Sequence, residues 1–209
     1  MHPGGQVEVV APVKAKPAEI EAFVAASRAW IERARGQLRD QPVLDRSLPE
    51  RVALPAISAE FWVQYGADVG RRRWHEQNGR LKLPIPQHQA AKGRKLLKSW
   101  LAQTGRAHLV PWLRRTAMDT GIDFNKTQVR GQKTRWGSCS ARGTISLNYC
   151  LLFLEPALVH YLLVHELCHR VHFNHSRRYW ALVEKLIPDC RALDRRLGDA
   201  WRAVPGWAL

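Results

Sequence analysis

Residues 156–172 read PALVHYLLVHELCHRVH, and this stretch decides much of the fold around it. Apolar side chains dominate its first half, which favours a helix that is buried in the core. These side chains are Leu158, Val159, Leu162, Leu163 and Val164. The sequence therefore predicts a core helix over 156–172 that carries polar residues in its second half.

Residues 165–169 of this helix form the pattern His-Glu-Leu-Cys-His. Residues four apart lie on one face of a helix, so the imidazoles of His165 and His169 can reach one metal ion. Glu166 lies about 100° around the helix from His165, where it reaches a water molecule beside the metal. Two histidines and a glutamate are costly in a core helix without a metal. The pattern therefore predicts a Zn²⁺ site with Glu166 as the general base.

A catalytic zinc ion usually has a third protein ligand and leaves its fourth position to water. His172 shares the helix face, but it lies about 10 Å along the axis from His165, so a straight helix excludes it as a ligand of the same ion. His175 follows Asn174, a residue type that tolerates the left-handed backbone of a reversing chain. We therefore predict that His175 is the third ligand of one zinc ion.

Glu184 is the competing candidate, because some zinc hydrolases take a glutamate from the helix after the histidine pattern. It lies in a second predicted helix, over 176–187, which Pro188 ends. Glu184 directly follows Val183, so it points about 100° away from the apolar side of that helix. This orientation favours His175 over Glu184.

Further motifs surround the histidine pattern. The run Thr134-Arg-Trp-Gly-Ser-Cys-Ser140 and the run Ile145-Ser-Leu-Asn148 precede it, and Asn174-His-Ser176 and Tyr179-Trp180 follow it. Over about residues 126–188 the chain resembles the YgjP-like metallopeptidases, minimal zincins related to SprT-like proteases. The resemblance implies a zinc site at His165, His169 and His175, a catalytic Glu166, and peptide or protein substrates. Residues 5–12 and the helix with Trp30-Ile31 are similar to the family's first strand and helix, but the basic strand that usually precedes them is missing.

The residues before the histidine helix predict a hairpin of strands 126–136 and 143–149, with Ser138–Gly143 as the turn. Its outer strand could pair with an extended peptide through main-chain hydrogen bonds. Trp136 and Asn148 would then lie near the substrate, or Trp136 would be core and Asn148 would cap a turn. His172 and Tyr179 are candidates for supporting the metal ligands or, with Arg135, for stabilising the oxyanion.

The whole pattern predicts an α+β fold with a β-rich N-terminal part, 1–87, and a zincin-like domain, 88–209. Its remaining elements are a strand at 6–12, a helix at 17–38, a connector at 40–56, strands at 60–66 and 72–84, and a helix at 88–118. Asn78-Gly79 predicts a tight turn within the second of these strands. Pro111 is a potential break in the last helix, and Gly121 would end it.

The chain has 209 residues, with 33 Lys and Arg against 18 Asp and Glu, a net charge of +15. Such an excess favours nucleic acid or anionic surfaces, or it forms a solvated face. The alternative function is therefore a nucleic-acid-associated protein, or a DNA-localised protease, with a mainly structural zinc. Glu166 distinguishes the readings, since a structural site needs no carboxylate there.

The chain has no apolar stretch long enough to span a membrane and no signal-peptide pattern at its start. Its four cysteines include no closely spaced pair, which is typical of a reducing compartment. We therefore expect a cytoplasmic protein without a membrane partner.

Overall fold

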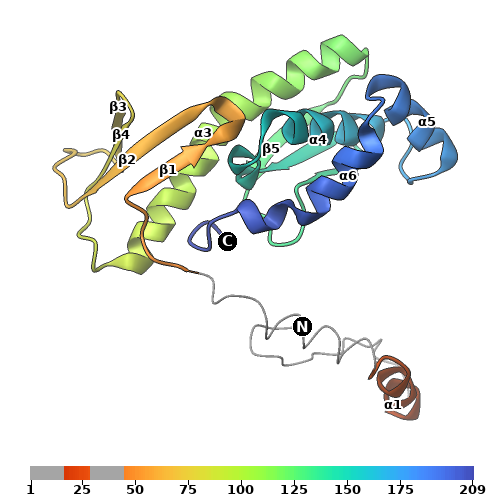
Figure 1. The fold of residues 1–209 in the computed structure, drawn as a ribbon, viewed down its shortest axis with the longest axis horizontal. Helices are drawn as coiled ribbons and strands as arrows, with labels where there is room; N and C mark the ends of the chain where they lie inside the picture. Colours follow the sequence, from red (N-terminus) through yellow and green to blue (C-terminus); the bar gives the residue numbers. More distant parts are fainter. Residues whose placement is uncertain (1–16, 29–44) are drawn as a thin grey trace. The chain divides into compact units, whose positions relative to one another are not determined.

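The computed structural model describes residues 17–28 and 45–209 (Figure 1). The chain divides into two compact units, 1–44 and 45–209. In the first unit, α1 (Pro17–Ala26) is the beginning of the helix predicted over 17–38. The rest of that helix, apart from Ser27 and Arg28, and the strand predicted at 6–12 lie outside the described residues.

The second unit begins with a four-stranded sheet in the order β1-β2-β4-β3. Its strands are β1 (Arg51–Leu54), β2 (Ala59–Tyr65), β3 (His75–Gln77) and β4 (Arg80–Leu83). The strands β1 and β2 are antiparallel, β2 and β4 are parallel, and β3 and β4 form a hairpin. The hairpin turns at Asn78 and Gly79, both with positive φ (49° and 69°), as the sequence predicted.

The predicted connector at 40–56 is wrong for its last residues, because these form β1 and the start of a 3₁₀ turn, η1 (Pro55–Ile57). Val52 and Leu54 point into the core, whereas Arg51 and Ala53 are exposed. The prolines that suggested a connector lie on either side of the strand and not within it. Their ring therefore removes no hydrogen bond from the ladder.

A long helix, α3 (Ala90–Thr120), follows the first sheet and is continuous through Pro111. It ends at Gly121, which adopts a left-handed conformation (φ 67°), as the sequence predicted. The helix packs against one face of the first sheet, where the Phe61 and Trp100 rings meet edge-on at 5.1 Å. The Trp100 indole also donates a hydrogen bond of 2.7 Å to Glu76.

The second sheet has the order β5-β7-β6, with β5 (Lys126–Arg130), β6 (Gly137–Cys139) and β7 (Thr144–Asn148). The predicted hairpin of 126–136 with 143–149 is wrong: β5 is parallel to β7, and the antiparallel partner of β7 is β6. The reason is the loop that follows β5. The side-chain amide of the buried Asn148 donates hydrogen bonds to two carbonyls of this loop, those of Gln132 (2.8 Å) and Arg135 (2.9 Å). This loop carries the chain to the other edge of β7.

The C-terminal part contains η2 (Tyr149–Phe153), α4 (Pro156–Cys168), α5 (Arg177–Leu186), α6 (Cys190–Asp199) and η3 (Ala200–Ala203). The helix α4 is buried, as predicted, but it ends at Cys168 rather than at His172. The amides of Arg170 and Val171 bond to carbonyls three residues back, at 2.8 and 3.0 Å, which closes the helix in tight turns. The predicted helix at 176–187 corresponds to α5, whereas α6 was not predicted.

Residues from the first sheet, α3, α4 and the second sheet form one hydrophobic core; Leu81, Trp100, Leu147 and Val159 are each at most 1% exposed. The α+β class is therefore confirmed, and the division into domains at residue 87 stays a prediction. None of the helices in the described parts of the chain combines the length and the apolar character that a membrane span requires.

Candidate active site

Three histidines come together where α4 ends and α5 begins. The Nε2 atom of His165 lies 3.2 Å from that of His169 and 3.3 Å from that of His175. Among the described residues, these three are the group of histidine, cysteine or acidic side chains whose donor atoms could hold a metal ion, all within 4.8 Å of one another. The structure thus places His175 beside the pair on α4.

The chain reversal between α4 and α5 explains how His175 reaches this position. The chain turns after Cys168, and Ser176 begins α5 as its N-cap, with its hydroxyl accepting from the Tyr179 amide at 3.4 Å. A capped helix start fixes the backbone that carries the preceding residue. The turn after Cys168 and the capped start of α5 therefore position the backbone of His175, although its side chain is exposed.

The hydrogen bonds behind His165 and His169 fix which ring nitrogen carries the proton. The Nδ1 atom of His169 lies 3.1 Å from the His172 carbonyl, which only accepts, so Nδ1 is the donor. The Tyr161 hydroxyl donates its proton to Asp194 at 2.7 Å and therefore accepts from Nδ1 of His165 at 3.3 Å. In both neutral rings the Nε2 atom carries a lone pair and no proton.

Two lone pairs that face each other at 3.2 Å repel unless a positive group lies between them. A proton does not fit well there, since burial lowers the pKa of His165 to about 3 and also lowers that of His169. Neutral imidazoles with converging Nε2 atoms are the donors that zinc and similar divalent ions prefer. The donor set therefore fits a metal cation.

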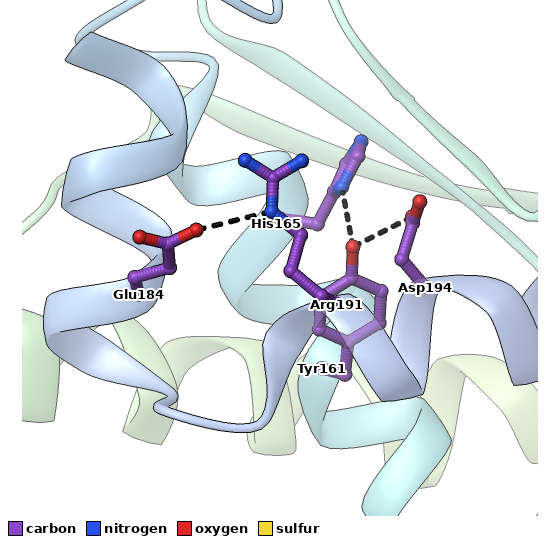
Figure 2. A network of polar contacts seen from close by, with 5 residues as sticks. All are labelled: Tyr161, His165, Glu184, Arg191 and Asp194. Carbon is purple, nitrogen blue, oxygen red and sulfur yellow. Dashed lines mark hydrogen bonds and ion pairs between the residues drawn. The ribbon is translucent and has the colours of Figure 1, made fainter. Parts of the chain in front are cut away.

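Figure 2 shows the polar contacts of the His165 ring. The Tyr161 hydroxyl lies between the His165 ring and the Asp194 carboxylate, and so connects α4 to α6. Metal-bound histidines usually donate their second nitrogen to such a partner, which fixes the tautomer and the ring orientation. His169 has the corresponding partner in the His172 carbonyl.

Glu184, the competing ligand of the sequence analysis, lies in another environment. Its carboxylate accepts from Arg191 at 3.0 Å, and Figure 2 shows this pair beside the Tyr161 network. The Arg191 guanidinium also lies 3.7 Å from the centroid of the Trp180 ring. Glu184 is therefore not among the residues that surround the three Nε2 atoms.

Glu166, the residue after His165, is buried, and one of its carboxylate oxygens is unpaired among the described residues. Its side chain is 4% exposed, and its Oε2 atom has no hydrogen-bond partner among the described residues. Burial raises the pKa of Glu166 to about 8, although the charge of Arg135 acts in the opposite direction. An unpaired buried carboxylate is rare and costly, which is typical of a functional group.

Gly137, the first residue of β6, lies directly against the Glu166 carboxylate. A Cβ atom at Gly137 would lie 2.6 Å from Oε1 of Glu166 and 3.0 Å from its Cγ and Cδ. Any larger residue would therefore displace Glu166 or the strand. Because β6 is an edge strand, the glycine brings the sheet edge into contact with the glutamate.

Tyr179 and His172, two candidates from the sequence, support the histidines. The Tyr179 hydroxyl donates to the His165 carbonyl at 3.3 Å, and its ring stacks on His169 at 4.7 Å. Its hydroxyl is thus already engaged with α4. His172 contributes its main-chain carbonyl to His169.

Trp136 and Asn148 are engaged with the protein interior. The buried Trp136 ring stacks on Trp201 at 4.0 Å, and its indole donates to the Leu197 carbonyl at 3.0 Å. Asn148 is fully buried, caps η2 by accepting from the Cys150 amide, and holds the loop before β6. Both residues therefore position β6 next to α4.

Sequence reasoning missed Tyr161, Asp194 and Gly137. Tyr161 lies four residues before His165, so helical spacing alone could have placed it on the same face. Asp194 lies on the unpredicted α6, 33 residues away from its partner Tyr161. Gly137 was quoted within a motif, but no spacing argument relates a strand glycine to a helix glutamate.

The chain is similar to a known protein family and to a solved structure. A protein-family model described as "YgjP-like, metallopeptidase domain" matches residues 1–200. The crystal structure of the metallopeptidase zymogen of Pyrococcus abyssi abylysin is similar, with a TM-score of 0.41 and 26% identity, covering 45% of this chain and 95% of that chain. No curated protein matches the chain. The family match confirms the resemblance in the motifs: the chain belongs to the YgjP-like metallopeptidase family.

Proposed function

We propose that the protein is a zinc-dependent metallopeptidase in which His165, His169 and His175 hold one Zn²⁺ ion and Glu166 is the general base. One observation carries this proposal: unprotonated Nε2 atoms converge at the end of α4, and Glu166, the residue after His165, has a buried carboxylate oxygen with no partner among the described residues. Converging lone pairs and an unpaired buried carboxylate cost free energy, which a bound cation would offset, and groups of this kind cluster at functional sites.

The set of three imidazoles supports zinc as the metal. An all-imidazole set of three is typical of catalytic zinc sites, which keep a fourth position open. A structural site would usually have four protein ligands, whereas the group here has three members. When bound, zinc supplies a Lewis acid that lowers the pKa of water to about 7 and polarises a carbonyl.

Glu166 then moves the proton of the hydrolysis. Its carboxylate takes a proton from the attacking water as the water oxygen forms a bond to the peptide carbonyl carbon. The same carboxylate gives that proton to the amide nitrogen as the carbon–nitrogen bond breaks. Burial, which raises the pKa of Glu166, favours holding the proton between the two steps, whereas a bound cation would favour the ionised form that accepts it first. Arg135, whose charge reaches Glu166, is the candidate for stabilising the oxyanion.

The edge strand β6 offers a place for an extended peptide. Trp136 and Ser140 bond through their main chain to Asn148 (2.8 Å) and Thr144 (3.0 Å), so this set of residues faces β7. The alternation of an antiparallel ladder turns the main-chain groups of Gly137 and Cys139 to the other side. A substrate pairing with these groups would pass Glu166, which Gly137 touches. The proposed substrates are therefore extended peptide segments of proteins.

The decisive experiment replaces Glu166 by glutamine and measures both metal content and peptide cleavage. We expect stoichiometric zinc, a retained fold, and cleavage slower by about 10²–10⁴-fold, because the amide cannot accept the proton. Glu184→Gln is the matched control and should cleave like wild type. Wild-type rates in Glu166→Gln, or zinc without cleavage of any peptide in a library by the wild type, would contradict the proposal.

A further inference from the structure

Of the two faces of the first sheet, the described residues cover one and leave the other open. Val52, Phe61 and Leu81 point to the core, and Phe61 lies against Trp100 of α3. The alternating side chains point the other way, and among them Trp62 is 59% exposed. A large aromatic ring on an open sheet face has no role in the core that the described residues form.

The strand register places basic side chains on both sides of this tryptophan. Arg51 of β1 and Arg80 of β4 are the direct neighbours of Trp62, and Gln77 of β3 continues the row. The Arg51 guanidinium lies 6.0 Å from the centroid of the Trp62 ring. Lys82 and Gln64 form the next row on the same face. We call the surface formed by Arg51, Trp62, Gln64, Gln77, Arg80 and Lys82 the outer sheet face.

Two shallow hollows flank Arg80 on this face. One has a volume of about 340 Å³ and is lined by Trp62, Val63, Gln64 and Arg80. The other, of about 450 Å³, is lined by His75, Gln77, Asn78, Arg80 and Lys82. The second hollow is polar and carries two cationic side chains, whereas the first has the indole as its wall. An apolar ring surface and an anion-attracting hollow thus lie next to each other.

Hydrogen bonds at the edge of the face hold further donors in place. Arg72 donates to Nδ1 of His75 at 2.8 Å, and Nε2 of His75 donates to Gln77 at 3.3 Å. This orientation follows because a guanidinium only donates. Within residues 17–28 and 45–209, the remaining N–H groups of Arg72 and the amide N–H groups of Gln77 have no acceptor. The acid on this side, Glu60, is already paired with Arg51 at 3.2 Å.

We propose that the outer sheet face binds single-stranded nucleic acid, with a base stacked on Trp62 and backbone phosphates at Arg80 and Lys82. An aromatic ring on a sheet that is flanked by basic side chains provides both parts of such recognition, stacking and phosphate neutralisation. The net charge of +15 supplies the long-range attraction.

The same features disfavour other partners for this face. A four-stranded sheet is too wide for the major groove of duplex DNA, which admits a helix or a two-stranded ribbon. Apart from Trp62, the face carries polar and charged side chains, so it offers little apolar area for a protein interface. A single strand presents unpaired bases to the indole and phosphates to the cations. It is therefore the partner whose chemistry complements this face.

Fluorescence anisotropy with a labelled oligodeoxythymidylate of about 12 nucleotides tests the proposal on the full chain. Trp62→Ala should bind roughly 5- to 150-fold more weakly, because one stacked base is lost. Arg80→Ala/Lys82→Ala should reduce the slope of log affinity against log salt by about 1.4, since two phosphate contacts are removed. Trp62→Phe, which keeps an aromatic surface, should recover most of the affinity.

The matched control is Arg114→Ala/Arg115→Ala, which removes two exposed charges from α3. The proposal is overturned if this control weakens binding as much as Arg80→Ala/Lys82→Ala, or if Trp62→Ala binds like wild type. Tighter binding to a duplex of the same length, or binding only to vesicles of phosphatidylglycerol and phosphatidylcholine, also overturns it. Thermal melting of each variant separates lost binding from lost folding. The zinc site is not involved, so Glu166→Gln should bind the oligonucleotide like wild type.

Discussion

Glu166 on α4 and Glu184 on α5 belong to neighbouring helices and carry the same functional group, yet their surroundings differ in every respect. Glu166 is 4% exposed, and its Oε2 atom has no partner among the described residues. The Glu184 side chain is 48% exposed and is paired with Arg191 at 3.0 Å. The comparison shows that packing, not residue type, decides whether a carboxylate near the histidines is buried without a polar partner or is paired with an arginine.

The helix α6 contributes to both environments. Its Arg191 pairs with Glu184, whereas its Asp194, nearly one turn later, accepts from Tyr161 and thereby orients His165 (Figure 2). An exposed ion pair of the first kind contributes about 0–1 kcal/mol to stability. The second interaction orients His165, which we propose as a metal ligand, so its expected effect is on metal binding rather than on stability.

The largest expected effect is the loss of bound metal, which should distinguish the surroundings of the three histidines from those of Glu184. We expect His175→Ala to lose bound zinc on dialysis, because two imidazoles alone hold the ion weakly. Glu184→Ala should retain stoichiometric zinc, since its carboxylate is bound to Arg191. Elemental analysis after dialysis measures both. Retention in His175→Ala together with loss in Glu184→Ala would reverse the assignment of the third ligand.

The next effect concerns the position of the Glu166 carboxylate. Gly137→Ala adds a methyl carbon that would lie 2.6 Å from Oε1 of Glu166, so the carboxylate or the strand must shift. A displaced general base should slow peptide cleavage on the order of 100-fold while zinc remains bound. Gly198→Ala is the control, because a Cβ atom there meets nothing within 4 Å. Equal cleavage rates in the two variants would show that the close approach of β6 has no catalytic role.

Removing the partner of His165 should have a smaller effect. We expect Tyr161→Phe and Asp194→Ala to weaken zinc affinity by about 10–100-fold, because the imidazole loses the acceptor that fixes its tautomer. Competition with a fluorescent chelator measures the affinity. Arg191→Ala, on the same helix, is the control and should bind zinc like wild type. If Tyr161→Phe bound zinc as tightly as wild type, the hydrogen bonds between His165, Tyr161 and Asp194 would have no role in metal binding.

The smallest effect is a pH dependence of stability in the presence of a chelator. Burial raises the pKa of Glu166 from 4.5 to about 8, so the folded protein keeps a proton that the unfolded chain releases. Metal-free protein should therefore lose stability as pH rises towards 8. Above about pH 6.5, where unfolded histidines are already neutral, the loss amounts to about 2 kcal/mol.

Below that range His165 acts in the opposite direction. Its pKa falls from 6.5 to about 3, so stability rises with pH until the unfolded histidine is neutral. Urea unfolding at a series of pH values, compared between wild type and Glu166→Gln, isolates the contribution of Glu166. Parallel curves between pH 6.5 and 8 would contradict a proton held by the buried carboxylate.

The parts of the fold that sequence reasoning identified depend on neighbouring residues. Helical spacing of apolar residues predicted α4, and the pair Asn78-Gly79 predicted a turn whose positive φ values those residues tolerate. The histidine pair of α4 is also local, because residues four apart share a helix face whatever surrounds them. His175 was predicted from the short loop, and the structure places it beside that pair.

The parts that sequence reasoning missed depend on distant residues. Strand β5 pairs in parallel with β7 because Asn148, through its side chain, holds the loop between β5 and β6. A regular alternation of strand residues is the same in both arrangements, so the pattern cannot distinguish a hairpin from a crossover. The helix α6 was missed in the same way, and with it Asp194.

The sequence by itself determined that this chain has a core helix with two histidines on one face and a glutamate beside them, because helical geometry converts spacing directly into direction. It also determined the family through its ordered motifs. Only the tertiary structure decided that Glu166 is buried against Gly137, that Tyr161 and Asp194 orient His165, and that Glu184 pairs with Arg191. The physical reason is that burial and hydrogen bonding arise from side chains brought together by packing, whose separation along the chain carries no periodic signal.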